Sequence, residues 1–246
     1  IEDITYDKDK KLKITNKDEI SNIYTFTTTN PEAYFEWFNE KQKEEKRRLV
    51  ESFAVQNNKN IEEVPDYKVK TTLQVALQIL KRYRDKKFEN NLENKPISII
   101  LTTIMAQIYT GENNVYELIK KFSNNYYKYI KIKDGIEWVE NPVNSEENFA
   151  DKWQIHPERK EAFKFFVSEL KNDIVNNTFI TSGDLFEESK SYKEIFGTKI
   201  VEKAYASIGK QAKTLRENGN MYIDKDATIN FEQQGTNVKE HKFFGQ

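Results

Sequence analysis

The sequence predicts a mainly α-helical protein. Through the middle of the chain, apolar residues recur three and four positions apart, a spacing that gathers them on one face of a helix. Proline or asparagine precedes several of these segments, and glycine follows others, as is typical of helix starts and ends. Segments rich in β-branched residues are short and lie mainly near the two ends. Neither an internal repeat nor a Pro-rich or Ser-rich linker divides the sequence, so one compact unit is expected.

At the beginning of the chain, strand-like residues lead into a helix. Residues 23–29 are β-branched or aromatic, which favours a strand. Asn30 and Pro31 follow, and asparagine caps helix N-termini while proline fits the first helical position. A helix is therefore expected to begin at Pro31 and to fade near Asn57. Its buried side is expected to carry Tyr34, Trp37 and Phe38.

Four helices are expected in the middle of the chain. Residues 70–86 should form an amphipathic helix, since leucine and alanine recur there at helical spacing. Pro96 should open the second, residues 97–109, which is apolar on nearly all sides and therefore central. Residues 115–132 and 158–176 should form the third and fourth.

Between the third and fourth helices, residues 141–153 predict a turn followed by a short capped helix. Asn141 and Pro142 stop the strand-like run before them. Asn144 is placed to cap a helical turn, and Glu147 follows three residues later, as a capping box requires.

The last part of the chain predicts shorter elements. Helices are expected at residues 191–196 and 200–218, each followed by a glycine that ends it. Strand-like segments at 221–223 and 228–231 predict a small hairpin or an extended arm. Residues 235–246 are expected to be loosely ordered.

Composition limits the function classes. The chain has 246 residues, 37% of them hydrophobic, and no cysteine, which excludes disulfides and thiolate metal sites and fits a cytoplasmic location. His156 and His241 are its only histidines, which argues against a histidine zinc site. No apolar run approaches the roughly 20 residues of a membrane span, so no membrane partner is expected. The formal net charge of −1 gives no basic footprint for nucleic acid, although a local patch stays open.

Five blocks of the sequence carry a family resemblance. They read NPEAYFEWF at 30–38, LQVALQILKRYRD at 73–85, KPISIILTT at 95–103, NPVNSEENFADKW at 141–153, and GT followed by HKFFG within 235–245. In these blocks, and in their order, the chain resembles the CD-NTases, the bacterial relatives of cyclic GMP-AMP synthase and oligoadenylate synthase.

The resemblance implies the helical C-terminal half of a polymerase-β-like nucleotidyltransferase, with a few strands left from a truncated catalytic sheet. Residues 1–29 would then be remnant strands of the catalytic domain. Residues 30–232 would form a helical domain like that of oligoadenylate synthase, and residues 233–246 a flexible tail.

The resemblance also implies a catalytic half whose metal ligands this sequence lacks. Family members carry a Gly-Ser turn and three aspartates that hold two Mg²⁺ ions for phosphoryl transfer. This chain has no Gly-Ser dipeptide. Asp7–Asp9 and Asp224–Asp226 have the Asp-x-Asp spacing, but lysine stands inside both pairs, and solvated turns explain them better. The chain, which starts at Ile1, is therefore expected to contain no catalytic or metal-binding residue and to be inactive alone, with Mg²⁺ bound elsewhere in the parent enzyme.

The nucleotide-binding residues also follow from the resemblance. It places Lys81 where related synthases use a lysine against the triphosphate, and Ser98 where they use a serine that opens the next helix. An ammonium group and a hydroxyl at a helix N-terminus both suit phosphate. Gln78, one turn before Lys81, and Arg82 complete the set, while Ile99 replaces the tyrosine on which animal relatives stack the base. The alternatives are a solvated helix face for the basic residues, Arg84 among them, and backbone capping for Ser98.

The function implied for the parent protein is the synthesis of cyclic di- or trinucleotides from nucleoside triphosphates in antiphage defence. The alternative is a stand-alone helical module that binds nucleotide, RNA or protein without catalysis. Tyr126–Tyr129, with Lys128 and Lys131, leaves stacking on nucleic acid open against packing on a neighbour. Residues 239–246 are a candidate contact for a regulatory protein.

Overall fold

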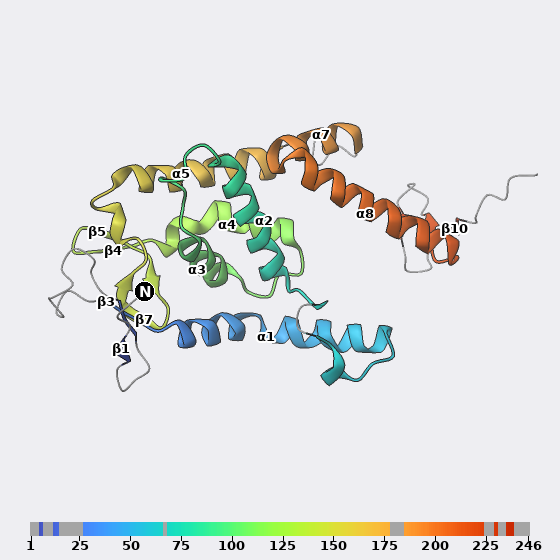
Figure 1. Ribbon diagram of the computed structural model, residues 1–246, viewed down its shortest axis with the longest axis horizontal. Helices are drawn as coiled ribbons and strands as arrows, with labels where there is room; N and C mark the ends of the chain where they lie inside the picture. Colours follow the sequence, from blue (N-terminus) through green and yellow to red (C-terminus); the bar gives the residue numbers. More distant parts are fainter. Residues whose placement is uncertain are drawn as a thin grey trace, which may run out of the picture. The chain divides into compact units, whose positions relative to one another are not determined.

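The computed structural model describes a mainly α-helical chain, which confirms the predicted class (Figure 1). The described residues are 5–6, 12–14, 27–65, 68–177, 185–223, 229–230 and 235–238. The chain divides into two compact units, residues 1–177 and 178–246. One unit was expected over 30–232. The observed boundary lies inside that range, because α7 (Leu185–Phe196) and α8 (Thr198–Glu217) pack against each other.

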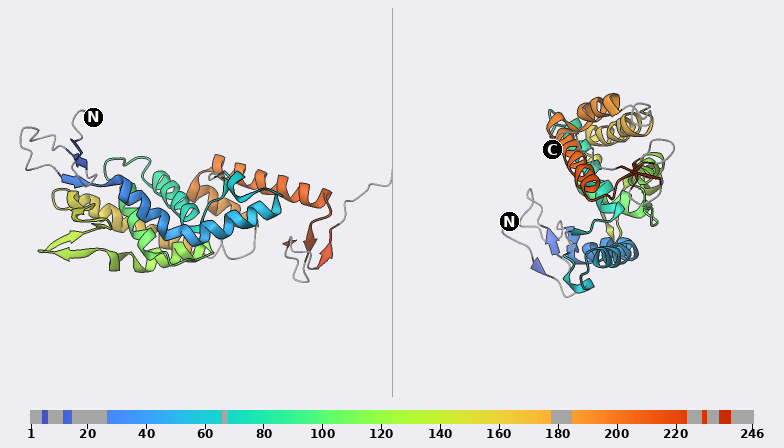
Figure 2. Two further views of the ribbon diagram at one scale, coloured as in Figure 1. Left: turned by 90° about the horizontal axis from the view of Figure 1, so that it is seen from below. Right: turned by 90° about the vertical axis from the view of Figure 1, so that its right-hand side faces the viewer.

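The first unit is a helical bundle with short strands at its edge. Its helices are α1 (Pro31–Gln56), α2 (Thr72–Lys87), α3 (Ser98–Ile108), α4 (Val115–Asn125) and α5 (Pro157–Leu170). Short turns of 3-10 helix are η2 (Ile61–Glu63), η4 (Tyr126–Tyr129) and η5 (Asp151–Trp153), and η6 (Lys171–Val175) is a π-helical turn. Helix α1 runs along one side of the bundle that α2–α5 form (Figures 1 and 2).

Among the described residues of this unit, the strands form three small antiparallel sheets. They are β1 (Thr5–Tyr6), β2 (Leu12–Ile14), β3 (Thr27–Thr29), β4 (Lys131–Lys133), β5 (Ile136–Trp138), β6 (Glu140–Asn141) and β7 (Asn144–Asn148). The sheets have the orders β1-β2-β3, β4-β5 and β6-β7. Of the strand predicted at 23–29, residues 27–29 are confirmed and the rest lie outside the described residues.

The predicted start and end of α1 are confirmed. The Asn30 Oδ1 atom accepts a hydrogen bond from the Ala33 backbone N–H at 3.0 Å, and Pro31 is the first helical residue. The helix ends at Gln56, and Asn57 is its C-cap. Its most buried polar residues, Gln42 and Glu45, were missed by sequence reasoning.

The core of the unit lies between α2, α3, α4 and α5. Helix α2 starts with a capping box, in which Thr71 accepts from the Gln74 backbone and Gln74 accepts from the Thr71 backbone. Helix α3 is central and apolar, as predicted. Residues almost inaccessible to solvent come from all four helices: Leu73, Leu80, Leu101, Ile104, Leu118, Phe122, Phe163 and Phe166.

The third helix is shorter than predicted. A helix was expected over 115–132, but α4 ends at Asn125 and Lys131–Lys133 is strand β4, which pairs with β5. The two residues between these strands, Asp134 and Gly135, have φ of 52° and 78°. Asp-Gly with positive φ at both positions is a favoured two-residue hairpin turn, and this local signal outweighs helical spacing.

The capping box predicted in residues 141–153 is wrong. This stretch forms the hairpin β6-β7, and only η5 at its end is helical. The Asn144 Oδ1 atom accepts from the Glu146 backbone N–H at 3.3 Å, and its Nδ2 atom donates to the Thr28 carbonyl at 2.9 Å. Asparagine that bonds the backbone two residues ahead stabilises a turn in place of a helix. Asn144 therefore ties β7 to β3.

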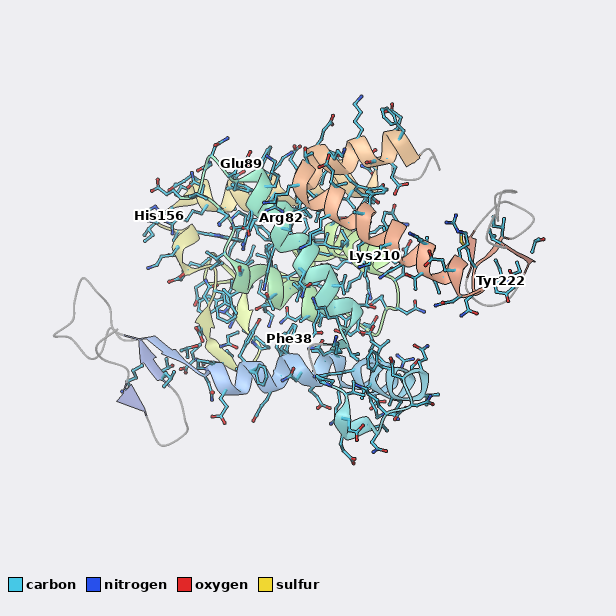
Figure 3. All side chains as sticks on the ribbon, turned by 45° about the vertical axis from the view of Figure 1, so that its right-hand side comes forward. Phe38, Arg82, Glu89, His156, Lys210 and Tyr222 are labelled. Carbon is cyan, nitrogen blue, oxygen red and sulfur yellow. The ribbon has the colours of Figure 1, made fainter. Side chains whose placement is uncertain are left out.

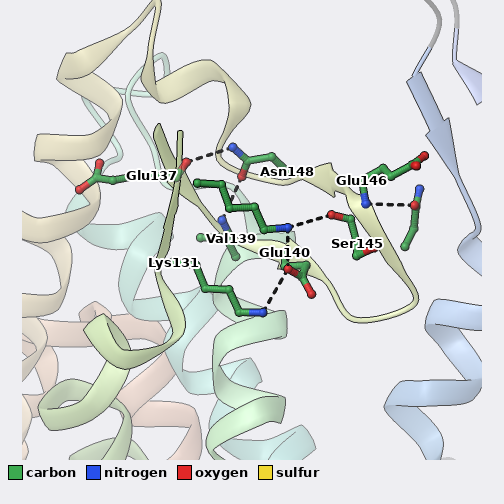
Figure 4. A network of polar contacts seen from close by, with 9 residues as sticks. Lys131, Glu137, Val139, Glu140, Ser145, Glu146 and Asn148 are labelled. Carbon is green, nitrogen blue, oxygen red and sulfur yellow. Dashed lines mark hydrogen bonds and ion pairs between the residues drawn. The ribbon is translucent and has the colours of Figure 1, made fainter. Parts of the chain in front are cut away.

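Asn148 holds this hairpin to the preceding one. The Asn148 Oδ1 atom accepts from the Val139 backbone N–H at 2.9 Å, and its Nδ2 atom donates to the Glu137 carbonyl at 3.0 Å (Figure 4). The Lys131 ammonium lies 3.1 Å from the Glu140 carboxylate, an ion pair between β4 and β6. The two hairpins are thus one connected structure.

In the described part of the second unit, two helices precede a small sheet. Helix α7 begins six residues before the helix predicted at 191–196; acidic residues in its first turn suit a helix N-terminus. Helix α8 agrees with the helix predicted at 200–218. The sheet has the order β10-β8-β9, with β8 (Tyr222–Ile223), β9 (Ile229–Asn230) and β10 (Thr236–Asn237), so the predicted hairpin is confirmed. Part of the tail that was expected to be flexible is therefore strand β10, which pairs with β8. Residues 239–246 lie outside the described residues.

Candidate functional site

The candidate site lies where α2 approaches the start of α3, and Arg84 joins the two helices. Arg84 is only 6% exposed. Its Nη1 atom donates to the Pro96 carbonyl at 3.1 Å and to the Ser98 hydroxyl at 2.7 Å. Its Nε and Nη2 atoms donate to one Asp85 oxygen at 3.0 and 2.7 Å. The solvated position considered for Arg84 is therefore wrong, and the residue fixes the entrance of α3.

A signal for the burial of Arg84 was present in the sequence. Leu73, Leu77 and Leu80 define the buried stripe of α2, and position 84 continues it at the same spacing. A charged residue in an apolar stripe requires partners, because an isolated buried charge is strongly unfavourable. The partners are Asp85, which follows it directly, and the segment that opens α3.

Asp85 is shared between two cations. In addition to Arg84, the Lys95 ammonium lies 3.3 Å from the Asp85 carboxylate. Burial opposes ionisation of Asp85, but the hydrogen bonds and positive charges of Arg84 and Lys95 outweigh it and hold its pKa below the usual value. Asp85 therefore stays ionised and holds the loop before α3 against α2.

Lys81 is a half-buried cation beside another cation. Burial, followed by the positive charge of Arg84, lowers the pKa of the Lys81 ammonium. Lys81 forms no hydrogen bond or ion pair with another residue in the described part of the chain. A desolvated ammonium under repulsion is stabilised by an anion, which is the property expected of a phosphate contact.

Ser98 lies close to this cation pair through Arg84. It is the first residue of α3 and is half-buried, and its Oγ atom accepts from Arg84. Because it accepts an N–H there, its own proton is available for another acceptor. The structure thus brings Lys81, Arg84 and Ser98 together.

Gln78 and Arg82 lie more openly on α2. Both are exposed, and Figure 3 labels Arg82 on this helix. They are four residues apart and therefore neighbours on the helix surface. The Gln78 Oε1 atom accepts from the Lys70 ammonium at 3.2 Å. The nucleotide-binding role of Gln78 and Arg82 stays a prediction.

Helix α1 holds both helices of the site. The Glu45 carboxylate, 8% exposed as a residue, accepts from the Thr72 N–H and hydroxyl at 2.9 and 2.7 Å, and from the Tyr109 hydroxyl. A carboxylate at a helix N-terminus is favourable, because it meets unpaired N–H groups and the positive end of the dipole. Nearer its start, α1 is linked to α3 by Tyr34 and Thr103, whose hydroxyl oxygens are 2.9 Å apart. Burial raises the pKa of Tyr34 to about 12, so it stays neutral.

The aromatic residues considered for stacking are divided between core and surface. Trp153 is buried and packs on Phe163, with ring centroids 5.3 Å apart. Tyr126 also packs on Phe163, at 5.7 Å. Tyr127 is 58% exposed, with the Lys128 ammonium 5.9 Å from its ring centroid. Binding of nucleic acid at Tyr127 stays open.

The part of the chain that the structure describes offers no donor set for a metal ion. No group of three or more His, Asp or Glu residues lies there in a suitable arrangement. The pairs Asp7–Asp9 and Asp224–Asp226 lie outside the described residues. No described helix is both long and apolar enough to span a bilayer.

Comparisons with known proteins place the chain in a family. It is 31% identical, over 199 residues, to a c-di-GMP synthase of Roseivirga ehrenbergii, and the match covers 78% of this chain and 50% of that protein. Its fold is similar to that of the Bradyrhizobium diazoefficiens CD-NTase CdnG in complex with GTP, with a TM-score of 0.58 and 18% identity over 84% of this chain and 61% of that one. No protein-family model matches.

The fold is thus that of a nucleotidyltransferase of the CD-NTase kind. The chain belongs to the CD-NTase family, as its five sequence blocks implied. It spans about half the length of the curated relative that it matches.

Proposed function

We propose that this chain is the helical part of an enzyme that joins nucleoside triphosphates into a cyclic dinucleotide or trinucleotide, and that its α2–α3 junction forms one wall of the nucleotide site. The observation that carries the proposal is the grouping of Lys81, Arg84 and Ser98. Arg84 donates to the Ser98 hydroxyl, whose proton is available, and interacts electrostatically with Lys81, a cation without a described carboxylate partner.

In this proposal each residue has a separate role toward the triphosphate. Lys81 binds phosphate oxygens as a mobile point charge. Ser98 donates its hydroxyl proton to a phosphate oxygen, next to the N-terminus of α3. Arg84 positions Ser98 through their hydrogen bond of 2.7 Å. Gln78 and Arg82 contact the same nucleotide from the exposed side of α2.

GTP is the first substrate to test. The relative in Roseivirga is named a c-di-GMP synthase, and the structure of CdnG holds GTP. We infer that the parent protein uses at least one guanosine triphosphate. A role of the product as a second messenger in antiphage defence, and a cytoplasmic location, are part of the same proposal.

The proposal assigns the chemistry to Mg²⁺ and carboxylates outside this chain. The CD-NTase resemblance implies those carboxylates, and the described residues provide no donor set that fits a metal ion. The chain by itself, incubated with Mg²⁺ and all four nucleoside triphosphates, is expected to form no product. A cyclic dinucleotide in that assay would show that the chain has metal ligands of its own.

Binding of GTP to the parent protein tests the site. Lys81→Met should weaken GTP binding about tenfold or more, because charge-assisted hydrogen bonds to phosphate are lost. Lys86→Met is the matched control on α2, since the Lys86 ammonium pairs with Glu89 at 2.6 Å. Titration calorimetry measures the GTP affinity of both variants. If Lys81→Met binds GTP as tightly as Lys86→Met does, Lys81 does not belong to the site.

Product formation separates the enzyme from the binding module. A non-catalytic module predicts GTP binding that depends on Lys81 and no cyclic product from any longer form of the protein. Chromatography of reactions with the parent protein and GTP decides between them.

A further inference from the structure

A second candidate site is a small cleft between the start of α3 and the start of α5. Its volume is about 40 Å³. A cavity of roughly 10–15 Å³ holds one water molecule, so the cleft has room for one oxyanion of phosphate size. Figure 3 labels His156, the residue that precedes α5.

The cleft has basic residues set in apolar walls. Its cations are Lys95, Lys152 and Arg159, and no acidic residue lines it in the described part of the chain. Trp153 and Phe163, both buried, form part of the walls. Apolar walls lower the local dielectric constant and strengthen the attraction between these cations and an anion.

Arg159 has an unused donor. Its Nε atom is buried and has no hydrogen-bond partner among the described residues. A buried N–H group without a partner is unfavourable, and most such groups in proteins are satisfied. Arginine suits an oxyanion well, because its planar fork of N–H donors matches the oxygens of phosphate.

Lys95 and Lys152 each lie near one carboxylate. Lys95 lies 3.3 Å from Asp85, whose charge is also held by Arg84. Lys152 lies 3.7 Å from Asp151, and the Lys152 side chain is 60% exposed. Arg159 in turn interacts electrostatically with Glu158, outside the cleft. The acidic neighbours of the three cations therefore lie outside the lining of the cleft, whose own charged residues are all basic.

We propose that this cleft binds a phosphoryl oxyanion, with Arg159 and Lys152 as direct contacts and Lys95 as an additional charge. The cleft differs from the candidate nucleotide site, since neither Lys81 nor Ser98 lines it. The proposal is independent of nucleotide binding at α2.

Inorganic phosphate is the first probe. Calorimetric titration of the full chain, against sodium chloride at matched ionic strength, should give saturable binding, since non-specific attraction is screened equally in both. Arg159→Gln and Lys152→Gln should each weaken it about tenfold, the effect of losing a charge-assisted hydrogen bond. Lys152→Gln removes an exposed side chain, so its effect is independent of any loss of folding in the other variant.

Lys164→Gln is the matched control, because Lys164 is an exposed lysine of α5 that pairs with Glu161 at 3.3 Å and does not line the cleft. It should leave phosphate affinity unchanged. Absent saturable binding, unchanged affinity in both cleft variants, or an equal loss in Lys164→Gln would each overturn the proposal. A loss confined to Lys81→Met would do the same and would assign the phosphate to α2.

Pyrophosphate and guanosine monophosphate identify the source of the oxyanion. Tighter binding of one of them than of phosphate, with the same loss in the two cleft variants, supports the cleft and names a diphosphate or a nucleotide as its ligand. If only inorganic phosphate binds, and both cleft variants weaken that binding, the result supports the cleft as a site for the free anion.

Discussion

The Arg84 guanidinium donates to the Ser98 hydroxyl at 2.7 Å, and this contact sets the direction in which Ser98 offers its proton. A hydroxyl that accepts from a fixed N–H group directs its own hydrogen elsewhere. In the proposed nucleotide site, Arg84 would act on the ligand through Ser98 as a positioning residue.

Replacement of Arg84 should therefore affect both folding and nucleotide binding. Arg84→Met removes the donor to Ser98 and Pro96 and should lower the free energy of unfolding by about 2–3 kcal/mol, because buried partners lose their hydrogen bonds. Urea unfolding measures this change. The affinity for GTP, measured in the parent protein below the unfolding range, should fall in Arg84→Met and in Ser98→Ala. The combined variant should lose less affinity than the sum of the two single losses, since both act through one hydroxyl. Strictly additive losses would contradict this.

Lys81 should reduce stability while it supports binding. Its pKa is lowered in the folded state by burial and by Arg84, so the unfolded state binds more protons between that pKa and the usual 10.5. Stability should rise with pH in this window, as the folded state escapes the buried charge. Lys81→Met should be at least as stable as the original chain at neutral pH, and its stability should not show this increase with pH. Urea midpoints measured from neutral pH toward 10.5 test this, and a fall of stability over that range in the original chain would contradict it.

Glu112 should make the first unit sensitive to acid. Burial raises the pKa of the Glu112 carboxyl, but hydrogen bonds from Lys121 and Thr110 outweigh it and lower the value from 4.5 to about 2. Because its pKa is lower in the folded state, the Glu112 carboxylate stabilises the fold at pH values above its pKa in the unfolded state. That stabilisation is lost as the pH falls through about 2. Glu112→Gln should be less stable at neutral pH, with a difference that shrinks below pH 4.5. A difference that is constant with pH would refute the role of its charge.

Glu45 should be far more sensitive to substitution than its neighbour. Glu45→Ala leaves the Thr72 and Tyr109 donors without their carboxylate and should cost about 2–3 kcal/mol of unfolding free energy. Glu44→Ala is the matched control, because the Glu44 side chain is 76% exposed and pairs only at the surface with Arg47. Its effect should stay within about 0.5 kcal/mol. Similar losses in the two variants would show that the Glu45 contacts add nothing.

The two asparagine signals show where sequence reasoning succeeds. Asn30 precedes a long segment with an apolar face, and its cap is where the sequence predicted it. Asn144 has the same local chemistry but is followed by Ser-Glu-Glu-Asn, which offers no face to bury, so a turn is favoured over a helix. Capping residues mark a boundary, and the burial that follows decides which element forms.

The candidate site was predictable only in part. The positions of Lys81 and Ser98 at the α2–α3 junction agree with the resemblance, whereas the link through Arg84 depends on how the loop before α3 returns to α2. The stripe of Leu73, Leu77 and Leu80 indicated that position 84 is buried, but its partner Pro96 is a contact that periodicity cannot supply. The cleft near Arg159 was missed for the same reason, since its cations come from separate segments.

The Glu45 contact also has a mechanical consequence. Strand β3 ends at Thr29, with Asn30 between it and α1. The carboxylate of Glu45, the fifteenth residue of that helix, accepts from Thr72 in the first turn of α2. At 1.5 Å per residue this is a stiff rod of about 22 Å. We expect a displacement of β3 to pass along this rod to the first turn of α2, the helix that carries Lys81.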